Sequence, residues 1–143
     1  MTPDQRKFLQ GRFRKAVIEQ PELKNLKSLL LSFGGDFIVA PPSQDRHVPT
    51  LLKSGFLMSG SVLMKPMRDN MCHQNIAAVW RKGRRGLVGV ATGYALSNDG
   101  LWRQHTWGFM RDGVLESTEE RRKYFGILLQ DSAADYFASC NNY

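Results

Sequence analysis

The sequence predicts a single α+β domain, with helices first, then a helix packed on an antiparallel sheet, and a helix at the end. Three observations indicate this fold. Apolar residues recur at helical spacing in residues 1–33, residues 87–129 are rich in β-branched and aromatic residues broken by tight-turn signals, and residues 131–137 return to a helical pattern. Apolar residues make up 42% of the 143 residues, which is enough for a core, and no repeat or long linker divides the chain. We therefore expect residues 1–143 to form one domain.

The N-terminal region, residues 1–33, is expected to be helical. Its apolar side chains follow a helical period until Pro21 interrupts it, and leucines then resume the period up to Gly34-Gly35. Residues 36–40 form a short apolar run that suits either a strand or an extended connection. Residues 48–70 show no clear period, so we assign them no single structure.

A helix is expected over residues 70–83, with Asp69 or Asn70 as its N-cap and Gly83 at its end. A last helix is expected with Asp131 or Ser132 as its N-cap. Together with the strands between them, these helices make residues 70–143 the predicted catalytic core.

Four strands are expected between these two helices. Their alternating patterns occupy residues 87–97, 101–110, 114–117 and 124–129. Tight turns at Asn98-Asp99-Gly100 and Arg111-Asp112-Gly113 connect the first three strands, so we expect them to pair as antiparallel hairpins.

The chain is basic, with 20 Lys and Arg against 13 Asp and Glu, for a net charge of +7. Such a charge favours an anionic partner, for example nucleic acid or an acidic protein. The candidate anion-binding residues cluster near the end of the predicted helix: Arg81, Lys82, Arg84 and Arg85. Basic residues also suit a helix C-terminus through the helix dipole, so solvated charge is the plainer explanation of the cluster.

The sequence contains no run of eighteen apolar residues, and its charged N-terminus lacks the apolar segment of a secretory signal. We therefore expect a cytoplasmic protein without a membrane span. Export by a route that needs no cleavable signal stays open, and the sequence indicates no oligomeric state.

Cys72 is the candidate nucleophile. We expect both Cys72 and Cys140 to be free thiols, because a chain of this length does not need a disulfide. The start of a helix favours a thiolate through its unpaired N–H groups and its positive dipole end. The same N–H groups suit an oxyanion hole, for which Asn70 and Gln74 are candidate side-chain donors.

His105 and Glu116 are the candidate partners of Cys72, since a nucleophile needs a base and the base needs a third group to orient it. They lie on two strands that pair across the turn at Asp112-Gly113, and they meet if their side chains share a face of the sheet. Asp112 and Asn98 are alternative partners of the histidine.

Four short motifs carry a family resemblance, which covers residues 70–118. They are Cys72-His-Gln-Asn, Gly93-Tyr94, His105-Thr-Trp107 and Glu116-Ser-Thr118. Their order resembles the transglutaminase-like core of the papain-like superfamily. The resemblance implies that Cys72 attacks an amide carbonyl, that His105 acts as base and then as acid, and that Glu116 orients the histidine. Glu116 stands where the family usually has Asp.

The resemblance implies a cysteine acyl-transfer enzyme that needs no cofactor. Hydrolysis of a protein, peptide or other amide is the favoured reaction, which makes the protein a protease, amidase or deamidase, and an amine acceptor would make it a transferase. Trp107, two residues from His105, is a candidate wall of the substrate site, with packing as its plainer role. The alternative function is a non-catalytic binding module or inhibitor on the same scaffold that holds an anionic partner.

A metal site is not expected. Cys72 and His73 are adjacent, and this spacing does not let two ligands converge on one ion. We expect His73 to be a surface residue or a neighbour of the site, and His47, in a Pro-rich loop, to be solvated.

Overall fold

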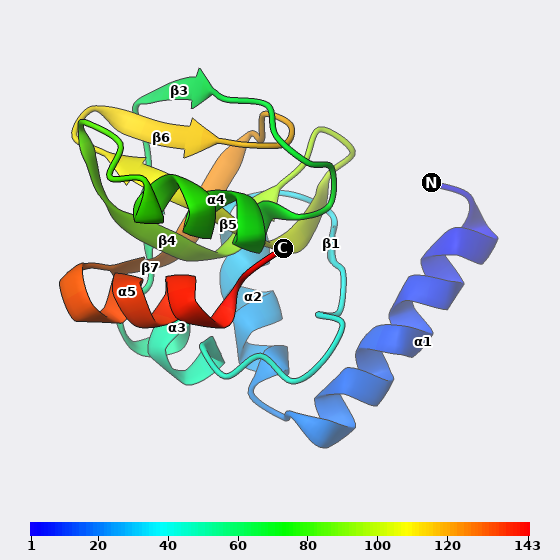
Figure 1. Cartoon of the computed structure of the whole chain (residues 1–143). Helices are drawn as coiled ribbons and strands as arrows, with labels where there is room; N and C mark the ends of the chain where they lie inside the picture. The colour runs from blue at the N-terminus through cyan, green and yellow to red at the C-terminus, as the bar shows by residue number, and fades with distance from the viewer.

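The computed structural model describes all of residues 1–143 as a mixed α+β protein, with five helices and a curled seven-stranded sheet (Figure 1). The helices are α1 (Pro3–Glu19), α2 (Leu23–Phe33), α3 (Val48–Ser54), α4 (Cys72–Arg81) and α5 (Asp131–Cys140). The strands are β1 (Phe37–Ile38), β2 (Phe56–Met58), β3 (Ser61–Met64), β4 (Leu87–Leu96), β5 (Leu101–Met110), β6 (Gly113–Glu116) and β7 (Lys123–Leu129). None of the helices is both long and apolar enough to cross a membrane.

The two N-terminal helices confirm the prediction for residues 1–33. At the start of α1, the side chain of Thr2 accepts a hydrogen bond from the N–H of Gln5, and the Gln5 side chain accepts one from the N–H of Thr2. α2 ends at Gly34, whose φ of 138° suits glycine. Residues 48–70, which showed no period, divide into α3, β2 and β3 before the loop that leads to α4.

The starts of α4 and α5 differ from the predicted ones. The N-cap of α4 is Met71, and neither Asp69 nor Asn70 caps the helix. Asn70 instead adopts φ 58°, a left-handed conformation that Asn tolerates and that turns the chain into α4. Gln130 precedes α5 without a side-chain capping bond, and Asp131 has φ 49°. Both helices therefore depend on packing rather than on caps.

The sheet is mixed, whereas the sequence predicted an antiparallel one. Its strand order is β2-β7-β4-β5-β6-β3, and all neighbours in this order are antiparallel except β6 and β3. β1 adds a second parallel pair, with β5. The predicted hairpins, β4 with β5 and β5 with β6, are present. The two parallel pairs join segments that are distant in sequence, so no turn signal marks them.

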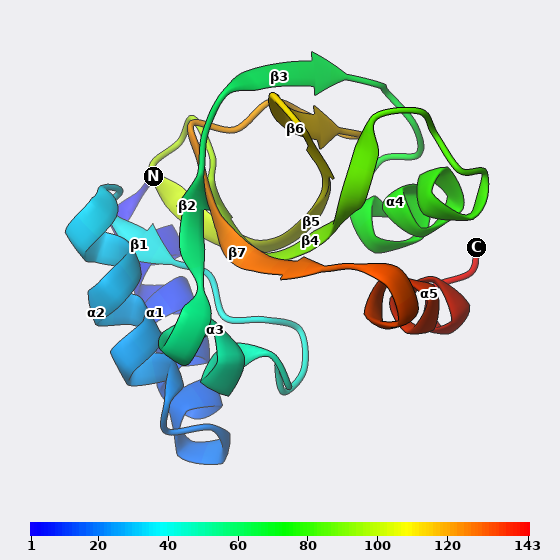
Figure 2. The same ribbon diagram turned by 90° about the vertical axis from the view of Figure 1, so that its left-hand side faces the viewer.

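The curl of the sheet creates an inside and an outside. Figure 2 shows the strands as a ring, with α4 and α5 on one side and α1, α2 and α3 on the other. One buried cluster packs the first three helices on the sheet around Leu26 and Trp102, and another packs α4 and α5 around Ile76. A third cluster, which includes Trp107 and Tyr124, draws side chains from all six strands from β2 to β7, so it fills the inside of the curl.

One edge of β5 is shared between two partner strands. Along its other edge β5 pairs with β4 from Trp102 to Met110. On the shared edge it pairs with β1 only at Leu101 and Trp102, and with β6 only at Gly108–Met110. Residues 103–107 therefore have no partner strand on this edge, and we call this opening the β5 gap.

Candidate active site

His105 and Glu116 point to the same side of the sheet and contact each other. The register pairs Gly108 with Leu115, which puts Trp107 opposite Glu116 and His105 two residues further along β5. Nε2 of His105 donates a hydrogen bond of 2.8 Å to Oε1 of Glu116, and the two side chains are 2% and 0% exposed. The sequence left this parity open, and the curl of the sheet turns the shared face inward.

Cys72 reaches His105 through the β5 gap. It is the first residue of α4 and is half-buried, and its thiol lies close enough to the His105 ring and to the backbone N–H of Thr106 for both to lower its pKa. Because Glu116 takes Nε2 of His105, Nδ1 is the ring nitrogen left for the thiol. One histidine therefore bridges a thiol and a carboxylate.

The start of α4 leaves backbone donors free beside the thiol. The backbone N–H of Asn75 is the first in α4 to make an i to i−4 hydrogen bond, which it donates to the carbonyl oxygen of Met71 at 2.8 Å. The N–H groups of Cys72, His73 and Gln74 precede it and have no such partner. These groups give this end of α4 a positive potential that favours a thiolate.

The charges of the three side chains support one another. Burial would raise the pKa of Cys72, but its contacts with His105 and the Thr106 N–H outweigh burial and hold the pKa below its ordinary value. Burial would lower the pKa of His105, yet the thiol and the Glu116 carboxylate raise it. Burial would raise the pKa of Glu116, and the hydrogen bond and positive charge of His105 lower it. The arrangement favours a thiolate and an imidazolium next to a carboxylate.

Glu116 is well supplied with hydrogen-bond donors. Its Oε1 accepts from His105 and from the hydroxyl of Tyr124, the latter at 2.9 Å. Its Oε2 accepts from the backbone N–H of Thr118 at 3.0 Å and from the Thr118 hydroxyl at 3.1 Å. These bonds keep the carboxylate ionised and fixed. Thr118 belongs to the Glu-Ser-Thr motif, whereas Tyr124 lies on β7 and no local pattern marked it.

Two aromatic rings hold the His105 ring from inside the curl. The Trp107 ring stacks on it with centroids 5.9 Å apart and planes at 26°, and the Tyr124 ring lies 6.4 Å away. Trp107 is 0% exposed and donates its indole N–H to the sulfur of Met58 at 3.3 Å. Of the two roles open for Trp107, the structure favours packing over a wall of the substrate site, because the side chain lies behind the histidine and is not exposed.

Two hollows open on either side of Cys72, with volumes of about 590 and 400 Å³. Asn70, Arg103 and Gln104 line both of them, so these side chains lie nearest to any molecule that approaches the thiol. Asn70 was a candidate from the sequence. No motif marked Arg103 and Gln104, although they immediately precede His105 on β5.

Other predicted residues do not join the site. Asp112 is exposed in the turn between β5 and β6, and the carbonyl oxygen of Asn98 accepts a hydrogen bond from Arg122. Neither contacts His105, whose partner is Glu116. Gln74 lines neither hollow beside the thiol, whereas Asn70, the other candidate oxyanion donor, lines both.

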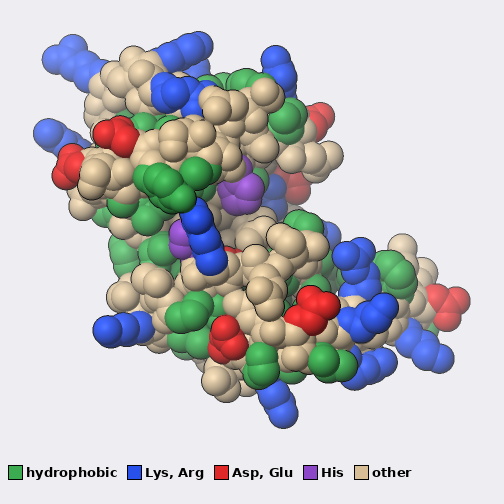
Figure 3. Space-filling model, turned by 60° about the horizontal axis from the view of Figure 1, so that its bottom comes forward, with side chains coloured by type: hydrophobic (Ala, Val, Ile, Leu, Met, Phe, Trp, Pro, Cys, Tyr) green, Lys and Arg blue, Asp and Glu red, His purple; other side chains and the backbone are tan.

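The remaining two histidines lie beside the site rather than in it. The His73 ring is hydrogen-bonded to the Thr106 hydroxyl, and burial, with a further contribution from His105, lowers its pKa. His47 is half-buried rather than solvated, its N–H donates to Asp45 at 2.9 Å, and burial lowers its pKa. Figure 3 shows one face of the molecule. Histidine side chains reach the surface in the middle of that face, with Lys and Arg side chains spread around them. No three His, Cys, Asp or Glu side chains converge in a way that would hold a metal ion.

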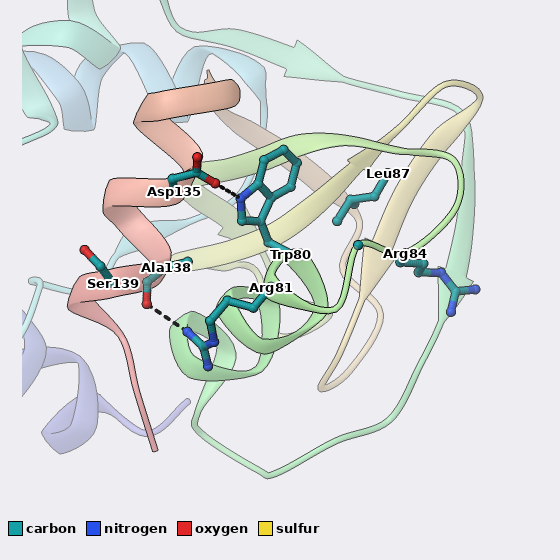
Figure 4. A pocket seen from close by; sticks show the side chains of 8 residues that line it. Trp80, Arg81, Arg84, Leu87, Asp135, Ala138 and Ser139 are labelled. Carbon is teal, nitrogen blue, oxygen red and sulfur yellow. Dashed lines mark hydrogen bonds between the residues drawn. The ribbon is translucent and has the colours of Figure 1, made fainter.

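The predicted anion-binding cluster lies at the far end of α4 from the thiol. A cavity of about 550 Å³ there is bordered by α4, the loop that follows it and α5 (Figure 4). Arg81 donates to the carbonyl oxygen of Ala138 at 2.8 Å, and the Trp80 indole donates to Asp135 at 2.8 Å, so both side chains fasten α4 to α5. None of the four residues of the predicted cluster lines the hollows beside the thiol, so the cluster is separate from the candidate site. The cluster consists of Arg81, Lys82, Arg84 and Arg85.

Comparisons of the chain with protein-family models, curated proteins and solved structures return no match. The case for a function therefore rests on the contacts around Cys72.

Proposed function

We propose that the protein is a cysteine-nucleophile acyl-transfer enzyme of the papain-like type, which hydrolyses an amide or peptide bond. The observation that carries the proposal is the position of His105, which donates to Glu116 at 2.8 Å and lies beside the Cys72 thiol, whose pKa it lowers. Burying an ionisable pair costs free energy that an apolar pair does not. A buried carboxylate and histidine that end on a half-exposed thiol are therefore better explained by chemistry than by stability.

In the proposed reaction the Cys72 thiolate attacks the carbonyl carbon of the amide, and the carbonyl π electrons move to the oxygen. The tetrahedral intermediate collapses as the C–N bond breaks, and the leaving nitrogen takes a proton from the His105 imidazolium. Water then attacks the thioester and gives a proton to His105. Collapse of the second intermediate releases the acid product and restores the thiolate and imidazolium.

Glu116 is a positioning residue in this scheme. It fixes the ring so that Nδ1 of His105 faces the thiol, and its charge stabilises the imidazolium. Tyr124 and Thr118 occupy its other acceptor positions, so it keeps its negative charge through the cycle.

The proposed oxyanion donor is the backbone N–H of Cys72, which the helix leaves unpaired. A second donor comes from a side-chain amide, Asn70 or Gln104, because both line the two hollows beside the thiol. Such donors act on charge that develops in the transition state.

A second candidate function is binding of an anionic polymer without turnover. The observation that favours it is unpaired positive charge, since the net charge is +7 and the one ion pair of a Lys or Arg with a carboxylate joins Arg103 to Asp99. This function predicts an affinity for nucleic acid that falls steeply with salt and survives Cys72→Ala.

Thiol alkylation tests the proposed enzyme. We expect iodoacetamide to label Cys72 at least about tenfold faster than the exposed Cys140 near pH 6.5, because His105 and the Thr106 N–H stabilise the Cys72 thiolate. His105→Ala should remove most of this advantage, and His47→Ala, a half-buried histidine outside the site, is the matched control. Equal and slow labelling of both thiols, unchanged by His105→Ala, would falsify the proposal.

A further inference from the structure

We propose that the substrate is a polypeptide that binds in an extended form along α1, with an acidic side chain held by Arg12 next to the reacting amide. This inference rests on the proposed function, because it takes Cys72 as the point at which the bound chain is attacked. α1 lies along one side of the molecule, and the segment that follows β1 runs beside it (Figure 1).

A row of hollows follows α1 and meets the thiol. The hollow of about 400 Å³ beside Cys72 is bounded by Leu9 and Arg12 on α1 and by Val39 and Pro42 across from it. Toward the end of α1, a hollow of about 650 Å³ shares Arg12 and Pro42 with it. Toward the start of α1, a third hollow of about 370 Å³ shares Leu9 with it. These three hollows form the α1 groove.

The length of the α1 groove suits a polypeptide rather than a small amide. α1 has 17 residues, which span about 25 Å at the helical rise. An extended chain advances about 3.3 Å per residue, so about seven residues of a substrate fit along it.

The α1 groove also offers apolar contacts that the core does not use. Phe13 is the only buried residue of α1, whereas Phe8 and Ile18 are 62% and 80% exposed. Both exposed side chains line the groove. Apolar side chains of a bound chain would remove this surface from water, which favours binding.

Arg12 supplies an unpaired positive charge next to the thiol. Its guanidinium lies 5.9 Å from the centroid of the Phe8 ring and takes part in no ion pair, whereas Arg103, the other cation of this hollow, is held by Asp99 at 2.8 Å. No Asp or Glu lines this hollow. Three acidic side chains and a further cation, Arg121, line the other hollow beside the thiol; the acidic residues are Asp69, Asp99 and Glu119. The hollow next to α1 has arginines and no carboxylate, so an acidic side chain is favoured more there than in the other hollow.

A peptide library tests the inference. The complete protein is incubated with a mixture of proteome-derived peptides, and mass spectrometry identifies each peptide bond or side-chain amide that is hydrolysed. We expect Asp or Glu to be enriched at one position on one side of the attacked amide. Arg12→Glu should slow hydrolysis of those peptides by about tenfold or more and favour Lys or Arg at that position. Arg12→Gln should weaken the preference without reversing it.

Arg14→Glu is the matched control, because Arg14 is exposed on α1 and lines no part of the groove, so the preference should not change. Alkylation of Cys72 in every variant separates the two proposals. Fast alkylation and hydrolysis with no charge preference would overturn the substrate inference and leave the proposed function standing. A native protein whose Cys72 is alkylated fast but that hydrolyses no peptide would overturn the substrate inference alone, whereas slow alkylation of Cys72 that His105→Ala does not change would overturn the proposed function and the substrate inference with it.

Discussion

Tyr124 and His105 donate hydrogen bonds to the same oxygen of Glu116, at 2.9 and 2.8 Å. Burial and the neighbouring carboxylate raise the pKa of Tyr124, so its hydroxyl stays protonated and continues to donate. The strand β7 thus contributes Tyr124, which positions the Glu116 carboxylate through a hydrogen bond.

Replacing Tyr124 with Phe removes this donor and keeps the ring. We expect the pKa of Glu116 to rise and the pKa of His105 to fall, so that less thiolate forms near neutral pH. The alkylation rate of Cys72 should drop about fivefold, the equivalent of about 1 kcal/mol for one hydrogen bond. The pH profile of alkylation measures the effect, and Tyr136→Phe, at an exposed position of α5, is the control. A profile that Tyr124→Phe does not shift would contradict this role.

Replacing Glu116 with Gln should lower stability in a pH-dependent way. The folded pKa of His105 is raised, so the stability that this shift contributes is complete below its ordinary value of 6.5 and is lost as the pH rises through the folded pKa. The folded pKa of Glu116 is lowered, so its contribution is present above its ordinary value of 4.5 and is lost as the pH falls through the folded pKa. The loss in Glu116→Gln should therefore be largest between these limits.

Near pH 6 we expect Glu116→Gln to lower the free energy of unfolding by about 3 kcal/mol, because it leaves buried donors without an anionic partner. Urea unfolding at several pH values measures the loss. Glu119→Gln, an exposed change nearby, should have almost no effect. A loss that does not vary with pH would show that the ionised pair is not the cause.

Gly93 lies on β4 between β5 and β7, where the strands leave no room for a side chain. It pairs with His105 on β5 and with Gly126 on β7. A Cβ added at Gly93 would lie 2.2 Å from the carbonyl oxygen of Phe125 and 2.6 Å from Cα of Gly126, so the strands would have to separate.

We therefore expect Gly93→Ala to lower the free energy of unfolding by about 3 kcal/mol and to slow alkylation of Cys72. Gly11→Ala is the matched control, since its nearest neighbour would be the Arg14 side chain at 3.9 Å. In the helix α1 this change should raise stability by up to about 1 kcal/mol. Urea unfolding of both variants measures the difference, and equal stabilities would refute the close approach at Gly93.

Asn75 ties the loop before Cys72 to the rest of the protein. From within α4 its side-chain nitrogen donates to the carbonyl oxygen of Arg68 at 2.8 Å and to the hydroxyl of Ser117 at 3.2 Å. Its side-chain oxygen accepts from the hydroxyl of Tyr143 at 2.6 Å. The loop, the end of β6 and the C-terminal residues thus meet at one buried amide.

Asn75→Ala should lower the free energy of unfolding by about 2 kcal/mol, because it leaves buried partners unsatisfied. It should also slow alkylation of Cys72, since the loop that sets the start of α4 is released. Asn142→Ala, an exposed change near the C-terminus, is the control. Stability and alkylation measured together test the role, and a variant that matches the native protein in both would rule it out.

Local patterns predicted the parts of the site that lie within one element or one hairpin. The helical period put Cys72 at the start of α4, and the turn after β5 brought His105 and Glu116 to paired strands. A period of two residues says which side chains share a face. It does not say which face the sheet turns inward, and for this reason a wall of the site and simple packing both stayed open for Trp107.

Contacts between distant segments could not be predicted. Tyr124 reaches Glu116 only because β7 returns beside β4 and the sheet curls, and no residue of β7 signals this locally. The position of Gln74 away from both hollows and the exposure of Arg12 likewise depend on how α4 and α1 lie against the sheet. Such positions follow from the packing of whole elements and not from the residues next to them.

The β5 gap couples reactivity to the completion of folding. His105 and Glu116 lie on one hairpin, but Cys72 belongs to a separate helix and comes next to His105 only when α4 docks at the gap. Until then the chain holds an ordinary thiol with little thiolate near neutral pH. The thiol of a nascent or partly unfolded molecule would therefore react slowly with other proteins, and the high reactivity proposed for Cys72 would arise only in the complete fold.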